Sequence, residues 1–126
     1  MKVITIKQPW ATLIASGYKE YEFRSWQTKY RGPILIHAGK GVDKDALKKF
    51  EDLGLEYPKA QIIASVMLDD CILIDNNFND ELIRKNSKVY GMGDKVGTYA
   101  WKLSHVKKIN NSEYVKGQLS LWNIEI

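Results

Sequence analysis

Residues 17–26 read GYKEYEFRSW, and this stretch holds the end of a helix and the whole of a strand. Gly17 can take the left-handed backbone conformation that ends a helix. From residue 21 onward the side chains of a strand point alternately to its two faces, so Glu22, Arg24 and Trp26 share one face. We therefore expect two charged groups and an indole on one face of a strand that follows a short helix.

The residues before this stretch predict a strand and that short helix. Residues 3–6 are Val, Ile, Thr and Ile, which favour a half-buried strand. Pro9 suits the first turn of a helix, because its missing N–H would have no partner there. An apolar stripe with the spacing i, i+3, i+4 follows, formed by Trp10, Leu13 and Ile14.

The chain after residue 26 predicts four further strands. Each is a run of apolar and β-branched residues bounded by turn residues, and we expect them over residues 34–38, 61–74, 98–103 and 119–126. The second is too long for one flat strand and contains Asp69 and Asp70 in its middle. We expect it to be bulged or bent, as strands are at the corners of barrels.

Two further helices are expected between these strands. Asp43 can cap the first and Gly54 can end it, with a buried stripe made of Ala46, Leu47, Phe50 and Leu53. Asn79 or Asp80 can cap the second. About five or six strands with two or three short helices predict an α+β protein, built as a small β-barrel with helical decoration.

Length and composition are those of one ordinary globular domain over residues 1–126. The 126 residues are 44% hydrophobic and 27% charged, which excludes a disordered, collagen-like or coiled-coil chain. The longest nearly apolar run, residues 61–74, is shorter than the ~20 residues that a membrane-spanning helix needs. The first residues do not read as a secretory leader, so we expect a cytoplasmic protein.

The charged residues are unevenly distributed along the chain. Residues 1–40 carry seven Lys/Arg against two acids, residues 41–83 carry four against ten, and residues 84–126 carry eight against three. The net charge of +4 therefore hides two basic ends and an acidic middle. If the ends meet in the fold, they form one positive surface suited to phosphate, with the acidic middle facing elsewhere. Otherwise the lysines are scattered and solvated.

Several blocks in a fixed order carry a family signature. The pattern G-x-K-x-x-E-x-R is filled by Gly17, Lys19, Glu22 and Arg24. It lies between residues 7–10 (KQPW) and 31–38 (RGPILIHA), and the chain ends with 99–101 (YAW), 115–118 (VKGQ) and 121–122 (LW). Together these blocks resemble the ASCH domain family (activating signal cointegrator homology) over nearly the whole chain.

The resemblance implies a β-barrel related to the PUA domain, an RNA-binding fold, with the hallmark residues lining a cleft beside the barrel. Some short bacterial members deacetylate acetylcytidine nucleosides as amidohydrolases, and ribonuclease activity is associated with others. The amidohydrolases pair the hallmark lysine with a threonine three residues later. Glu22 stands at that position here and removes the hydroxyl group that this chemistry would use.

Lys19, Glu22 and Arg24 are candidates for binding and for catalysis. Lys19 follows a helix end, where its amine can point into a concavity and contact phosphate or a base carbonyl. Glu22 can accept a hydrogen bond from the exocyclic amine of a base, and Arg24 can bind phosphate. The alternative is an ion pair of Glu22 with Arg24 or Lys19, which would hold the barrel mouth and keep the amine protonated.

Two tryptophans flank this cluster in the sequence. Trp10 lies on the apolar stripe of the first helix and is expected in the core or in the cleft wall. Trp26 lies on the polar face of its strand, which makes it a candidate for stacking on a base. Stacking of one base on an aromatic ring contributes ~1–3 kcal/mol, so a single indole can change the affinity strongly.

The remaining reactive residue types predict neither a metal nor a cofactor. His37 and His105 each end a strand, with no Cys or second His at ligand spacing. Cys71 is the single cysteine and lies in an apolar run typical of the core. Residues 91–94 (GMGD) lack the G-K-[ST] ending of a phosphate loop, so we expect a flexible loop.

Three functional hypotheses remain open. The first is a protein that binds RNA or a modified nucleoside in a basic cleft formed by Lys7, Lys19, Arg24, Arg31 and Lys40, with Trp10 and Trp26 nearby. This hypothesis expects an exposed Lys19, whose replacement by alanine weakens binding without unfolding the protein. The second is a small hydrolase, similar to the acetylcytidine amidohydrolases or to ribonucleases, with Lys19 and Glu22 as its acid–base pair. The third is a protein-interaction barrel with an ion-paired mouth, whose protein partners the sequence does not name.

Overall fold

The computed structural model describes residues 1–110 and 113–125, which form an α+β fold. The elements are β1 (Lys2–Gln8), α1 (Trp10–Ala15), β2 (Tyr21–Arg24), β3 (Gly32–Val42), α2 (Lys44–Lys49), the 3-10 turn η1 (Glu51–Leu53), β4 (Gln61–Leu73), α3 (Asn76–Lys85), α4 (Ser87–Tyr90), β5 (Tyr99–Lys108) and β6 (Leu121–Asn123). The described residues form six strands, in agreement with the prediction, and four α-helices where two or three were predicted. None of these helices is long and apolar enough to cross a membrane.

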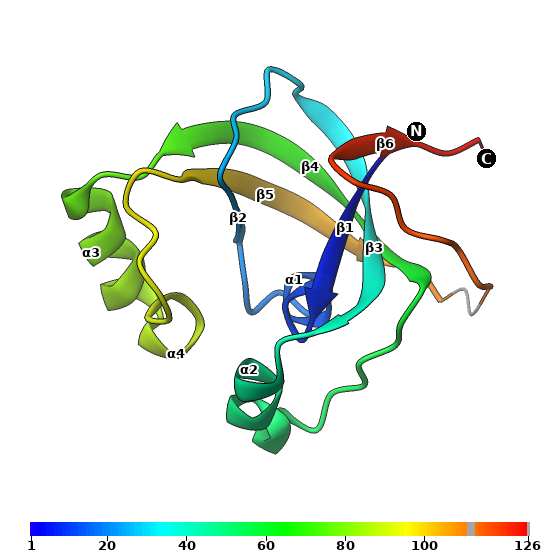
Figure 1. The fold of residues 1–126 in the computed structure, drawn as a ribbon, viewed down its shortest axis with the longest axis horizontal. Coiled ribbons are helices and arrows are strands. Elements are labelled where there is room, and N and C mark those ends of the chain that lie inside the picture. Colours follow the sequence, from blue (N-terminus) through cyan, green and yellow to red (C-terminus); the bar gives the residue numbers. More distant parts are fainter. Residues whose placement is uncertain (111–112, 126) are drawn as a thin grey trace.

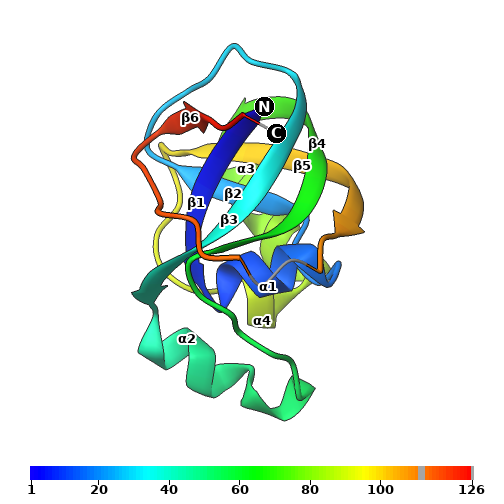
Figure 2. The same ribbon diagram turned by 90° about the vertical axis from the view of Figure 1, so that its right-hand side faces the viewer.

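The six strands form one mixed sheet with the order β2-β5-β4-β3-β1-β6 (Figure 1). β1 and β3 are parallel, and the other neighbouring strands are antiparallel. The sheet curves strongly, as Figures 1 and 2 show, but β2 and β6 remain its two edges. The predicted barrel is therefore not confirmed, since the described strands do not close into a ring.

The bent strand predicted over residues 61–74 is confirmed. β4 shifts its register with β5 twice, between Ser65 and Met67 and between Leu68 and Asp70. At the second shift Asp69 is the extra residue of β4, whereas at the first shift the extra residue belongs to β5. Such bulges increase the local twist and bend the strands. The bend lets one long strand pair with both β3 and β5 along its length.

Helix α1 begins where the sequence predicted and is held to the end of β1 by a buried glutamine. The Gln8 side chain accepts a hydrogen bond from the backbone N–H of Thr12 and donates to the Thr12 hydroxyl. It satisfies an N–H group that the first turn of a helix leaves without a partner. Gly17 follows the helix with a φ of +83°, in the conformation expected of a helix-ending glycine.

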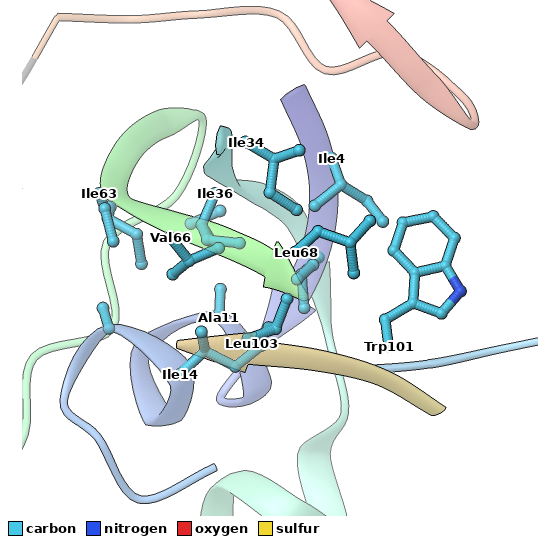
Figure 3. Close-up of a cluster of buried hydrophobic side chains, with 14 of the residues drawn as sticks. Ile4, Ala11, Ile14, Ile34, Ile36, Ile63, Val66, Leu68, Trp101 and Leu103 are labelled. Carbon is cyan, nitrogen blue, oxygen red and sulfur yellow. The ribbon is translucent and has the colours of Figure 1, made fainter. Parts of the chain in front are cut away.

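The main core lies between α1 and the sheet. Figure 3 shows apolar side chains from α1, β1, β3, β4 and β5 meeting in one cluster, with Trp101 at one end. Its labelled members are Ile4, Ala11, Ile14, Ile34, Ile36, Ile63, Val66, Leu68, Trp101 and Leu103. Of the predicted apolar stripe of the first helix, Ile14 packs in this cluster with Trp10 against it, whereas Leu13 packs in a second cluster. Cys71 is a buried free thiol of the main cluster.

A second cluster joins the α2 segment, α3 and α4 to α1 and β2. Leu13 packs there with Phe50 of the α2 segment, Leu82 of α3 and Tyr90 of α4. Asp43 caps α2 as predicted, but the single helix expected up to Gly54 is divided: α2 ends at Lys49, and Gly54 ends the turn η1 that follows. The predicted cap of the next helix was wrong: α3 begins earlier, because Asp75 rather than Asn79 or Asp80 accepts the hydrogen bond from the first turn.

The opposite face of the sheet is covered by the end of the chain. Val3, Leu35, Ile62 and Trp122 form a small buried cluster there. The two termini lie together, as Figures 1 and 2 show, because β1 pairs with β6. The strand predicted over residues 119–126 is shorter, since β6 covers Leu121–Asn123 and residue 126 lies outside the described residues.

Candidate functional site

A cleft of about 820 Å³ lies where β1, β2 and β3 meet the loop after α4 and the segment before β6. Its size is in the range of clefts that hold small ligands. Lysines and one arginine outnumber the carboxylates in its lining. The charged lining residues are Lys7, Lys19, Glu22, Arg24, Lys40, Asp43 and Lys95. The described ends of the chain therefore meet at one site, because residues 118–120 line it together with β1 and β2.

Glu22 is at the centre of a buried ion-pair network. Its Oε1 accepts hydrogen bonds from the Lys19 amine at 2.8 Å and from the backbone N–H of Phe23 at 3.2 Å. Its Oε2 accepts from two atoms of the Arg24 guanidinium, Nε at 3.2 Å and Nη2 at 2.9 Å. A carboxylate offers about four acceptor sites, so Glu22 is fully used.

The charges around Glu22 keep its carboxyl ionised. Burial alone would raise the pKa of Glu22, but the positive charges of Lys19 and Arg24 and their hydrogen bonds outweigh burial and hold the pKa below its ordinary value. The ion pair that the sequence left as an alternative is therefore present, and it includes both cations. Such a carboxylate anchors its partners and has no acceptor site left for a base amine.

Lys19 is buried rather than exposed, with only 4% of its surface accessible. The expectation of an exposed cleft lysine was wrong, because its amine lies 5.1 Å from the ring centre of Trp10 and 5.0 Å from that of Phe23. The faces of aromatic rings attract cations, and they replace part of the lost water. Replacing Lys19 therefore removes structural contacts as well as a charge.

Trp10 and Trp26 both line the cleft and are both half-buried. Trp10 packs edge-on against Phe50 and donates its indole N–H to Asp43 at 3.3 Å. Trp26 packs edge-on against the buried Trp101, with 4.8 Å between ring centres. Each indole thus has one side held by the protein and another side at the cleft.

The predicted basic residues do not all lie at the cleft. Lys7 and Lys40 line it and are exposed, but Arg31 does not. The Arg31 guanidinium donates to two backbone carbonyls nearby and lies 3.6 Å from Asp70. Of the acidic residues in the segment 41–83, Asp43 alone lines the cleft, so the acidic middle of the chain is not entirely remote from it.

Lys95 is a cleft residue that the sequence analysis missed. It lies in the loop between α4 and β5, which also contributes Met92 and Gly93 to the lining. Its side chain is buried, with 7% of its surface accessible, and its amine donates to the backbone carbonyl of Tyr90. Burial lowers the pKa of the Lys95 amine; Asp94 opposes this effect, and the nearby charge of Lys19 adds to it. The signal in the sequence was the set of glycines around it, which predicted only a loop.

A smaller hollow of about 380 Å³ adjoins the cleft and is built around the buried His37. The His37 Nε2 lies 2.6 Å from the carbonyl of Val115, so it carries the proton and donates it. The Nδ1 then accepts from the Thr5 hydroxyl at 3.2 Å, and the Trp122 indole donates to Thr5 at 3.1 Å. His37 therefore holds the segment before β6 against β1 and β3.

The described residues contain no group of three or more His, Cys, Asp or Glu side chains placed to hold a metal ion. Both ring nitrogens of His37 form hydrogen bonds within the protein. The Nδ1 of His105 lies 2.8 Å from the hydroxyl oxygen of Ser104, its neighbour on β5. Neither histidine is among the lining residues of the main cleft.

The fold and the cleft define an α+β protein with a strongly curved sheet and a site built on the segment between α1 and β2. Comparison with family models identifies the family: the model of the ASCH domain matches residues 4–114. The chain belongs to the ASCH domain family.

Relatives and solved structures agree with this assignment. "Activating signal cointegrator 1" from Mus musculus is 30% identical over 81 residues, and that from Homo sapiens is 28% identical over 81 residues. Each match covers 55% of this chain but only 14% of the relative. The crystal structure of ASCH from Zymomonas mobilis has a TM-score of 0.57 at 17% identity and covers 91% of this chain and 72% of that one. A mutant form of that Zymomonas mobilis protein has a TM-score of 0.54 at 18% identity, with 86% and 72% covered. At these identities, the structures support the fold alone.

Proposed function

We propose that this ASCH domain, acting as one unit over residues 1–126, binds RNA or a modified nucleoside in the cleft. The observation that carries the proposal is the lining itself. Five cationic side chains face two carboxylates, and three half-buried aromatic rings, Trp10, Phe23 and Trp26, lie among them. Cations that bind phosphate and rings that stack on bases are the two components of single-stranded nucleic-acid binding.

The Glu22 network supports binding over hydrolysis. General acid–base catalysis needs groups that exchange protons near the working pH. Glu22 is held ionised with all its acceptor sites in use, and its carboxylate lies against the Lys19 amine as a counter-ion. Glu22 is therefore suited to hold a fixed charge, with Lys19 as its ion-pair partner. We expect no release of acetate from acetylcytidine; turnover that is lost in Lys19→Met would favour the hydrolase instead.

The test of binding compares two double variants with equal loss of charge. Lys7 and Lys40 are exposed residues of the cleft, whereas Lys48 and Lys102 are exposed residues outside it. Binding of fluorescently labelled single-stranded RNA of 12 nucleotides is measured by anisotropy, and binding of nucleosides by quenching of tryptophan fluorescence. We expect the Lys7→Ala/Lys40→Ala variant to bind RNA about tenfold more weakly. The Lys48→Ala/Lys102→Ala variant should bind like the unmodified protein.

The outcomes separate the hypotheses. Equal weakening by the two double variants would mean that RNA is attracted by the overall charge and not by the cleft. Absence of binding to every RNA and nucleoside tested would contradict the proposal and leave the protein-interaction hypothesis.

A further inference from the structure

The buried and half-buried charges around Glu22 and Lys95 do not balance. Lys19, Arg24 and Lys95 are cations, and Glu22 is the carboxylate that pairs with the first two. Within residues 1–110 and 113–125, Lys95 forms no ion pair. Burying a charge without a partner is costly, so buried charges in proteins are normally paired. An excess of positive charge at a concave site indicates an anionic ligand.

The other carboxylates at the cleft or beside Lys95 are already in use. Asp43 accepts from the backbone N–H of Ala46 and from the indole of Trp10. Asp94 is exposed, and its Oδ1 accepts from the backbone N–H of Val96. Neither contacts the amine of Lys95, whose one hydrogen bond among the described residues is to a neutral carbonyl group.

The three cations retain donors that a ligand can use. An ammonium group has three N–H donors. Lys95 uses one of them on the Tyr90 carbonyl, and Lys19 uses one on Glu22. The Nη1 of Arg24 donates to no described residue. Both amines lie beside the ring of Phe23, at 5.0 Å for Lys19 and 5.7 Å for Lys95, and the charge of Lys19 acts on Lys95 within the same cleft.

We propose that Lys95 forms a subsite for a terminal phosphate group, together with the free donors of Lys19 and Arg24, so that the cleft takes a nucleotide in preference to a free nucleoside. This inference rests on the proposed function and names its ligand class. Three cations against one carboxylate leave two positive charges, which matches a phosphate monoester, with its charge of about −1.5 to −2 at pH 7. Burial lowers the pKa of Lys95, and a bound anion would oppose that shift as Asp94 does in part.

The loop around Lys95 suits this role. Gly93 and Gly97 have φ values of +72° and +89°, a conformation that glycine adopts without strain. They flank Lys95 and turn the loop so that Lys95 enters the cleft while Val96 stays exposed. The phosphate-binding residue is therefore supplied by a different element from the hallmark residues on β2.

The experiment compares each of the four ribonucleosides with its 5′-monophosphate at pH 7.5, by calorimetry. We expect the monophosphate to bind at least tenfold more tightly than the nucleoside in the unmodified protein. In Lys95→Met the ratio of monophosphate affinity to nucleoside affinity should fall below about twofold. Lys95→Arg keeps the charge and should retain the preference, and Lys102→Met is the matched control for an exposed lysine outside the cleft.

Further arms protect the test against misfolding and identify the source of the phosphate. Amide chemical shifts of the unmodified protein, titrated with inorganic phosphate, should change in the loop 91–98 irrespective of any variant. Short RNA with a 5′-phosphate should bind more tightly than the same RNA without one. If the two RNAs bind equally and Lys95→Met weakens both, the subsite holds an internal phosphate, and the proposal of a terminal phosphate is overturned. If nucleosides or RNA bind and phosphate gives no advantage, this inference alone fails. If nothing binds, the proposed function fails with it.

Discussion

At the scale of the residue, Glu22 connects stability to the site. Its carboxylate offsets two buried or half-buried cations, Lys19 and Arg24. Glu22→Gln removes the negative charge and leaves both cations without an anionic partner among the described residues. We expect the free energy of unfolding to fall by about 3 kcal/mol, measured by urea denaturation.

Glu20→Gln is the matched control for this variant. Glu20 is two residues away and pairs with Lys85, but both side chains are about half exposed. Ion pairs at the surface contribute little, so the loss should stay below about 1 kcal/mol. If the two variants lose similar amounts of unfolding free energy, the Glu22 network stabilises the protein no more than a surface ion pair does.

The pKa of Glu22 predicts how stability depends on pH. The carboxyl has a lower pKa in the folded protein than its ordinary value of 4.5, so the unfolded chain binds the proton more readily. The stabilisation is fully present above about pH 4.5 and is lost as the pH falls through the lower, folded value. We expect urea midpoints between pH 7 and pH 3 to fall less steeply in Glu22→Gln than in the unmodified protein. Parallel curves would show that other carboxyls control the acid unfolding.

At the scale of the element, the start of α3 tests the corrected helix boundary. Asp75 accepts a hydrogen bond from the backbone N–H of Phe78 at 2.8 Å, whereas Asp80 is an exposed residue inside the helix. Loss of a helix cap typically costs about 1 kcal/mol. Thermal or urea unfolding should therefore show a loss of this size for Asp75→Ala and none for Asp80→Ala. The reverse result would restore the boundary that the sequence suggested.

The turn between α4 and β5 is a second element whose geometry can be tested. A Cβ atom at Gly91 would lie 2.3 Å from the backbone carbonyl oxygen of Ser87, which cannot move without opening the last turn of α4. A Cβ at Gly93 would meet nothing within 4 Å, although the φ of +72° costs a non-glycine residue some strain. We expect Gly91→Ala to lower the free energy of unfolding by about 2–3 kcal/mol and Gly93→Ala by about 1 kcal/mol. Denaturation midpoints that rank the two variants the other way would contradict the described path of the turn.

At the scale of the whole molecule, the sequence predicted local features better than distant contacts. Gly17, Asp43 and Gly54 each act on neighbouring residues, and the structure confirms their roles. The pairing of Lys19 with Glu22 could also be foreseen, because they are three residues apart. The burial of Lys19 could not, since it depends on Trp10 and Phe23, which approach its amine from two different elements.

The cleft itself shows why site prediction was incomplete. Lys95 is 76 residues from Lys19 in the chain, yet both line the cleft. No sequence periodicity relates a lysine in a loop to residues so distant in the chain. Arg31 looked equivalent to Lys7 and Lys40 by charge, but its guanidinium is directed to carbonyls of its own turn. The choice of side chains at the cleft therefore required the fold, because the charge of a residue does not say which surface its side chain joins.

The meeting of the chain ends predicts a specific response to salt. The cleft has five cations and two carboxylates, which leaves about three positive charges for phosphate groups of RNA. Each neutralised phosphate of a single strand contributes about 0.7 to the slope of log K against log salt. We therefore expect a slope of about −2 for single-stranded RNA, measured by anisotropy at salt concentrations from about 50 to about 300 mM. Removing Lys7 and Lys40 should reduce the slope to about −0.7, whereas removing Lys48 and Lys102 should leave it unchanged. The two double variants have equal net charge, so only binding confined to the cleft gives them different slopes. If both variants reduce the slope equally, RNA contacts the surface broadly.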